Sequence, residues 1–121
     1  LVSAKLNGAN LSGADFTNAK LMLADLCELS AIETKFVGAN LAGAMMSEAC
    51  LQKANFTDAL LIGADLSGAN LEEANFTAAN LGGVNFDGAN LRGVNFSEAI
   101  LVGADFTNTD VSLALTSKSL Q

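Results

Sequence analysis

Carboxylates are the side chains of this sequence most able to take part in catalysis or metal binding. Glu72 and Glu73 are adjacent, and Asp25, Asp65 and Asp105 recur at equal intervals. General acid–base catalysis, however, needs a pocket that shifts the pKa of such groups. The chain also has no His, the commonest general base and metal ligand. The sequence therefore predicts a protein that is not an enzyme, with no catalytic residue, no cofactor and no metal site.

The composition indicates a single domain with a sizeable core. The chain has 121 residues, 50% of them hydrophobic, and a net charge of -7. This charge argues against direct nucleic acid binding and fits a basic partner or a well-solvated surface. No segment has the length and hydrophobicity of a membrane span or the pattern of a signal peptide. The chain begins at Leu1 in the middle of a pattern, so we expect a processed form or a fragment.

The acidic residues are embedded in a repeat with a period of five. From Leu1 to Val111, every fifth residue is large and apolar, except Ala31. An α-helix needs a period of 3.6 and a strand a period of 2, so neither explains the pattern. A chain that coils with twenty residues per turn would stack the phenylalanines that recur at that interval. These are Phe16, Phe36, Phe56, Phe76 and Phe96.

A second column, mostly Ala, lies two residues before the large one, and Asn or Asp often separates the two, as in Ala9-Asn10-Leu11. Over about residues 4–111 this pattern resembles the pentapeptide-repeat family, whose consensus is A(D/N)Lxx. The resemblance implies an all-β fold, a right-handed quadrilateral β-helix of about six coils. Four units would make one square coil, with the large residue and the Ala pointing inward. We expect the β-helix over 1–111 and a C-terminal cap or tail over 112–121.

Elementary packing agrees with such a coil. Coils stacked at the strand spacing of about 4.8 Å would make a rod on the order of 30 Å long. The narrow interior would admit one large and one small side chain per unit, and would be dry because no inward side chain needs a polar partner. Gly, which is frequent two places after the large residue, and Asn would occupy corners with positive φ, where β-branched residues fit poorly.

Two segments break the pattern. In 27–35, Leu29 and Thr34 replace Ala, and Ala31 replaces the large residue. Either the exchange at Leu29 and Ala31 conserves the local core volume, or the chain forms a bulge. After Asp110 the pattern decays. The segment there forms either a cap or a frayed end, and the residues that could form a cap are Leu113, Leu115 and Leu120.

The square coil sorts the outward residues into four sides. The side that contains Leu1 and Leu21, here called the apolar side, has Lys20 as its only charge. Exposed apolar clusters often mark an interface, although branched residues also simply suit a β surface. The predicted interface residues are Val2, Met22, Leu23, Leu60, Ile62, Ile100 and Val102.

The next side, here called the acidic side, contains Leu6 and Leu26 and has Lys5 as its only positive charge. It would fit a basic patch of a protein partner, or it is only a solvated face. A cation would be held weakly, since Met45 and Asn85 separate the aspartates. The acidic side is defined by Asp25, Glu28, Glu48, Asp65, Asp87 and Asp105.

The two remaining sides are predicted to be structural. The third side mixes acids with Lys53 and Arg92, and the phenylalanine side carries Asn and Thr in register, as at Asn75 and Thr77. Ladders of this kind are expected to form hydrogen bonds between coils. Cys27 and Cys50 fall on different sides and coils, so we expect free thiols in buried or half-buried positions.

Two functional hypotheses follow. The resemblance implies a non-catalytic scaffold or protein-interaction module, of a kind found in cyanobacteria and in the thylakoid lumen. The alternative that the family offers is an acidic DNA mimic that binds DNA gyrase or topoisomerase and confers quinolone resistance. The partner would be a protein in either case, or a second copy joined through the apolar side. The compartment, whether thylakoid lumen or cytoplasm, stays open.

Overall fold

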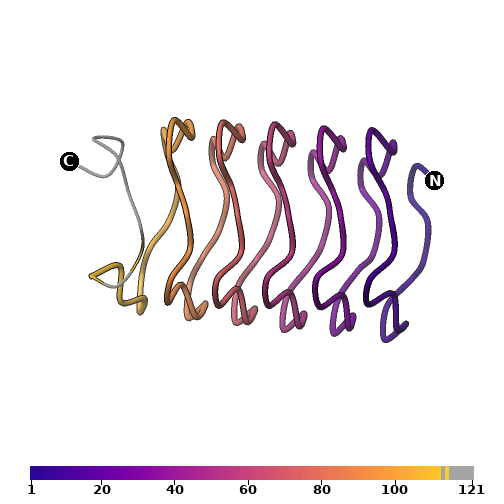
Figure 1. Cartoon of the computed structure of the whole chain (residues 1–121), viewed down its shortest axis with the longest axis horizontal. Helices are drawn as coiled ribbons and strands as arrows, with labels where there is room; N and C mark the ends of the chain where they lie inside the picture. The colour runs from indigo at the N-terminus through magenta and orange to yellow at the C-terminus, as the bar shows by residue number, and fades with distance from the viewer. Residues whose placement is uncertain (113, 115–121) are drawn as a thin grey trace.

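The computed structural model describes residues 1–112 and 114, which form a rod of stacked coils (Figure 1). Parallel bridges join residues twenty apart, from Lys5 and Asp25 at one end to Asn85 and Asp105 at the other. Each bridge is a single residue flanked by turns, so the described residues contain no α-helix and no extended strand. The coil of twenty residues, predicted from the phenylalanine spacing, is confirmed.

The backbone N–H groups of a five-residue unit are satisfied in a fixed order, which explains why the period is five. Their acceptors lie in the preceding unit, in the two neighbouring coils and on one side chain of the unit itself. In order, a unit has an inner small residue, a bridging residue, an inner large residue and two turn residues. In the unit 39–43 all five N–H groups have an acceptor, and none needs water. In sequence order they donate to Phe36 O, Ala19 O, Leu60 O, Asn40 Oδ1 and Ile62 O, over 2.6–3.1 Å.

The frequent Asn or Asp at the bridging position supplies the one acceptor that the backbone cannot. Every Asn and Asp at this position, from Asn10 to Asp110, accepts a hydrogen bond at Oδ1 from the N–H two residues later. Asn and Asp favour this local bond in turns. These side chains therefore close the turn of their own unit.

This finding corrects the expectation that the Asn and Thr ladders of the phenylalanine side bond between coils. Thr57 N and Oγ1 both donate to Asn55 Oδ1, at 3.0 and 2.6 Å, within one turn. A local bond needs no ordering of a second coil, so it forms more readily than a bond across the ladder. Elsewhere, the bond from Asn90 Nδ2 to Asn70 Oδ1, at 3.4 Å, does join two coils.

The second turn residue has a positive φ in every unit from Ser3 to Asn108, with values between 56° and 75°. A β-turn of this kind needs the left-handed region at its third position. The residues found there include Gly, Asn, Glu and Lys but no Val, Ile or Thr. The prediction that β-branched residues are excluded from these corners is confirmed.

Substitution of two glycines on the apolar side would distinguish the effect of backbone strain from that of steric crowding. Gly63 has φ +70° and open space where a Cβ would lie, so Gly63→Ala meets strain alone. Gly82 has no positive φ, and a Cβ there would lie 3.3 Å from Asn80 Oδ1. We expect Gly63→Ala to destabilise the fold by about 1 kcal/mol, and Gly82→Ala to change stability by less than about 0.5 kcal/mol. Urea denaturation followed by circular dichroism would check both, and equal losses would contradict the assignment of the strain to φ.

The interior is filled by the two inward columns, as predicted. From Leu21 to Ala99 every inward residue is buried. The rings of Phe36, Phe56 and Phe76 stack with centroids 4.9 and 4.7 Å apart and nearly parallel planes. The column extends to Phe16 and Phe96 at 5.6 and 5.7 Å.

A second phenylalanine column was not anticipated. Phe86 and Phe106, on the acidic side of the coil, stack at 5.1 Å. Phe86 also meets Phe76 and Phe96 edge to face, with centroids 6.1 and 5.9 Å apart. Edge-to-face contacts are a preferred aromatic geometry, so the two columns hold adjacent sides of the square together near the C-terminal end.

The irregular segment 27–35 passes through the core without a bulge. Leu29 and Ala31 are both buried, and the bridges of Ser30 and Lys35 continue the ladder. Thr34 is also buried, and its Oγ1 donates to Leu11 O at 2.8 Å. The interior is therefore not wholly free of polar side chains, because this hydroxyl needs a partner and finds one.

The repeating turn continues beyond the expected boundary at 111. Ala114 N donates to Val111 O at 3.2 Å, and Ala114 packs against the core. Ser112 Oγ donates to Asp110 Oδ1 at 2.6 Å, as in the earlier turns. The predicted cap residues Leu113, Leu115 and Leu120 lie outside the described residues.

Candidate interaction surfaces

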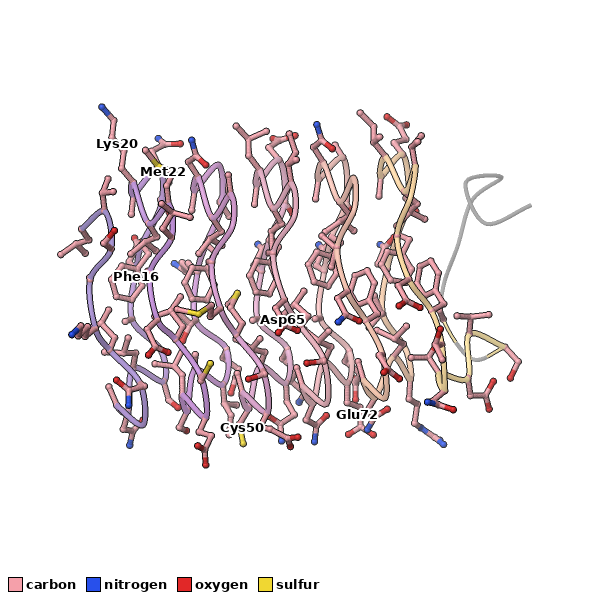
Figure 2. The ribbon with its side chains drawn as sticks, turned by 180° about the vertical axis from the view of Figure 1, so that it is seen from behind. Phe16, Lys20, Met22, Cys50, Asp65 and Glu72 are labelled. Atoms are coloured by element: carbon pink, nitrogen blue, oxygen red, sulfur yellow. The ribbon has the colours of Figure 1, made fainter. Side chains whose placement is uncertain are left out.

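The residues predicted to form an interface lie on the outside of one side of the rod. The exposed fraction is 80% for Val102, about half for Ile62 and Ile100, and 42% for Leu60, while Met22 is half-buried. Lys20 and Met22 lie at one edge of the rod in Figure 2, with Cys50 and Glu72 at the opposite edge. The apolar side and the third side therefore face away from each other.

Four of the six residues that define the acidic side have a structural role. Asp25, Asp65 and Asp105 each accept the N–H two residues later. Asp87 accepts a hydrogen bond from Asn108 Nδ2 of the next coil, at 3.0 Å. A carboxylate that closes a turn is less free to adapt to a partner, so this side is less suited to recognition than its charge suggests.

Glu28 and Glu48 are the exposed remainder of that side, and both sit at positive φ. The carboxylate of Glu48 lies over Gly68 of the next coil, where an added Cβ would fall 2.6 Å from Oε1. Because Gly68 has no side chain, the glutamate can lie against the backbone there. The Glu48 side chain is thus folded along the rod.

The two cysteines are free thiols, as expected. Cys27 is half-buried, and its Sγ accepts a hydrogen bond from Ser47 Oγ at 3.2 Å. Cys50 is exposed, contrary to the expectation of a buried or half-buried position. Its bridging position explains the difference, because a bridging side chain always points outward.

Potential metal ligands are dispersed over the described residues, which contain no group of three or more that could hold a metal ion. An open hollow is lined by Ala89, Asn90, Leu91, Arg92 and Asp110. Hydrogen bonds from the Ser112 side chain and backbone lower the pKa of Asp110, so its carboxyl is held ionised and cannot serve as a general acid near neutral pH.

The same hydrogen bonds within a turn also affect how the stability of the fold depends on pH. Hydrogen bonds from the Thr107 side chain and then its backbone lower the pKa of Asp105. A carboxyl whose pKa is lower in the folded state stabilises the fold above its unfolded pKa, and this contribution is lost as pH falls through the folded pKa. We expect Thr107→Val to raise the pKa of Asp105 toward its ordinary value, as measured by an NMR titration of the carboxyl carbon. An unchanged pKa would contradict the role given to the hydroxyl.

No helix in the described part of the chain has the length and hydrophobicity needed to cross a membrane. No functionally curated protein is significantly similar to the chain.

Several solved structures resemble the rod, including the following two. One is a pentapeptide repeat protein, Rfr23, from the cyanobacterium Cyanothece 51142, with 26% identity, a TM-score of 0.72, and coverage of 98% of this chain and 87% of that one. The other is AT2G44920, a pentapeptide repeat protein from the Arabidopsis thaliana thylakoid lumen, with 31% identity, a TM-score of 0.64, and coverage of 82% and 66%. A trypsin-treated variant of QnrB1, a plasmid-mediated fluoroquinolone resistance protein, has 19% identity and a TM-score of 0.49, which is too distant to bear on function.

The family profile for pentapeptide repeats matches eight copies, over residues 1–28, 19–58, 54–93 and 79–114. These matches together span all of the described residues, and proteins of this family form right-handed β-helices. The chain therefore belongs to the pentapeptide-repeat family.

Proposed function

We propose that the chain is a non-catalytic interaction module that binds a protein partner through its apolar side. One observation carries the proposal. The large exposed apolar side chains gather mainly on one side of the rod, and all the Asp and Glu residues lie on the other three. A contiguous apolar patch with a polar surround is typical of a protein interface.

The filled interior supports the same conclusion. From Leu21 to Ala99 it is packed with apolar side chains, with Thr34 as its buried polar residue. Small-molecule and catalytic sites need a concave pocket with a few convergent polar groups. A rod of this kind offers its outer faces instead, and a flat face suits a second macromolecule.

Substitutions that add charge at matched positions would test the proposal. Ile62→Asp,Ile100→Asp places two carboxylates on the apolar side. Ile32→Asp places one on the third side, at the turn position equivalent to that of Ile62, where Ile32 is 37% exposed. We expect a protein captured from an extract by the parent to be captured by Ile32→Asp but lost with the double variant. The captured protein, once purified, should bind the parent directly. Equal binding to all three chains would overturn the proposal.

The DNA mimic is the weaker alternative. Duplex DNA carries one charge per about 1.7 Å, so a duplex roughly 30 Å long has about 18 charges. The chain has 13 Asp and Glu against 6 Lys and Arg, and its acids are spread over three sides. We therefore expect supercoiling by gyrase to be unaffected when the protein is present in excess over the enzyme. Inhibition that weakens with salt would favour the mimic instead.

A further inference from the structure

The apolar side is not flat: large and small outward residues alternate along it, which a general apolar patch would not need. We divide it into steps, each named by its inward leucine and containing the bridging residue before it and the two turn residues after it. The Leu21, Leu61 and Leu101 steps carry large outward residues. The Leu41 and Leu81 steps between them carry Asn at the bridging position and only Ala or Gly in the turn. Ridges therefore alternate with grooves every second coil, at a repeat of roughly 9.6 Å.

The Asn residues of the groove steps lie close to the backbone. Asn40 Oδ1 accepts the N–H of Ala42, and Asn80 Oδ1 accepts that of Gly82, both at 3.1 Å. Their side chains are thereby held within their own turns and do not project as ridges. The groove at the Leu81 step is the more open, because both of its turn residues are glycine.

An alternation of this kind is complementary to a reversed copy of itself. A two-fold axis perpendicular to the rod pairs each step with another step of the second copy. When the axis passes through a step, ridges meet ridges. When it passes between two neighbouring steps, each ridge meets a groove, except where its partner is the Leu1 step, which carries Val2. The axis between the Leu41 and Leu61 steps also pairs the whole length of the side.

We propose that the apolar side joins two copies of this chain in an antiparallel dimer with its two-fold axis between the Leu41 and Leu61 steps. This inference rests on the proposed function and names its partner. Met22 then lies against the partner's Gly82, and Ile62 against the partner's Ala42. Leu23 leans over Gly43 of its own chain and faces the partner's Gly63 and Gly83. At the ends of the interface Val102 meets the partner's Val2.

Charge supports a second copy as the occupant. Each chain has a net charge of -7, so two copies repel one another over most of their surfaces. The apolar side is the one side without a carboxylate, and its single charge is Lys20. Two copies that meet there keep all their acids at a distance and in water. A strongly basic partner would instead be attracted to the other three sides.

The area of the side is sufficient for a weak dimer. A side about 30 Å long and five residues wide presents roughly 450 Å² in projection, and its ridges raise the accessible area above that. The pair then buries about 1,000 Å², the lower limit for a specific interface. We therefore expect a dimer with a dissociation constant in the micromolar range.

Sedimentation equilibrium, at concentrations up to about 0.2 mM, would test the association. We expect the parent and Ile32→Asp to dimerise, and Ile62→Asp to weaken the dimer by at least about tenfold. Ala42→Leu is the sharper variant, because it adds apolar surface but fills a groove. A patch that associates without specific packing would bind more tightly after this change, whereas the proposed dimer weakens.

A cross-link would test the register. In a chain with Cys27→Ser and Cys50→Ser, we would add Met22→Cys and Gly82→Cys. These two positions are about 14 Å apart within one chain, too far for an internal disulfide, but they face each other in the proposed dimer. Mild oxidation should give a covalent dimer of the double-cysteine chain and none of either single-cysteine chain.

Each result bears on the dimer separately from the proposed function. A monomeric parent, equal loss with Ile32→Asp, or tighter association of Ala42→Leu would overturn the dimer. A heterologous partner that still requires Ile62 and Ile100 would then uphold the interaction module without it. Loss of both kinds of binding would remove the proposed function as well.

Discussion

Phe56→Ala should destabilise the β-helix by about 3–5 kcal/mol, among the largest losses that one substitution can cause in this chain. Phe56 is fully buried, with rings stacked on both faces at 4.9 and 4.7 Å. Truncation leaves a cavity that the neighbouring rings cannot fill, because each is held by the coil above or below. Both stacking contacts are lost with the ring.

Far-ultraviolet circular dichroism during urea denaturation is the appropriate measurement, since the chain has no Trp or Tyr to report by fluorescence. Phe16→Ala is the matched control. Phe16 is half-buried and stacks on one ring only, at 5.6 Å. Its loss should be about half as large, because solvent already reaches the site. Equal losses at the two positions would show that stability does not depend on stacking within the column.

Leu29→Ala should destabilise the fold by about 2–5 kcal/mol, and the addition of Ala31→Leu should restore most of that loss. Leu29 and Ala31 are both buried on one side of the same unit, with sizes opposite to the usual order. Ala31→Leu alone overfills the core and should cost about 1–3 kcal/mol. The double variant returns the unit to the usual arrangement of small and then large.

A double-mutant cycle measures this compensation directly. We expect a favourable coupling at the upper end of the usual range of about 0.5–3 kcal/mol for residues in contact. Leu29→Ala with Ala69→Leu is the control, because Ala69 lies two coils away and its enlargement fills no space near Leu29. Additive losses in both pairs would mean that the two inward positions of a unit are packed independently.

Much of the fold could be predicted from the sequence because the core is strictly periodic. The spacing from Phe16 to Phe96 predicts twenty residues per coil, since such a coil stacks each ring directly on the next. The role of Asn55 and its equivalents was harder to predict. A column of Asn in register suggests bonds along the column, and only the backbone geometry shows that the free acceptor lies nearer the residue's own turn.

Exposure and function were less predictable, for the same physical reason. Outward residues make few contacts, so their types are weakly constrained by the fold. Cys50 was expected to be buried or half-buried because of its type, yet its place in the unit puts it on the surface. The alternation of ridges and grooves was present in the sequence at Ala42, Ile62 and Gly82. It became apparent only when the bridges placed these residues in one row.

The repetition of one hydrogen-bonding pattern in every unit has a consequence for how such a chain can change its length. The core depends on residue number modulo five, whereas the outer faces depend on it modulo twenty. Deletion of one unit, such as 64–68, should leave a folded β-helix by circular dichroism, but turn everything after it by a quarter of a revolution. Ile100 would then leave the row of Met22 and Ile62, and self-association should be lost. Lineages that add or remove four units at once would keep their surfaces, and those that add or remove one would acquire new ones.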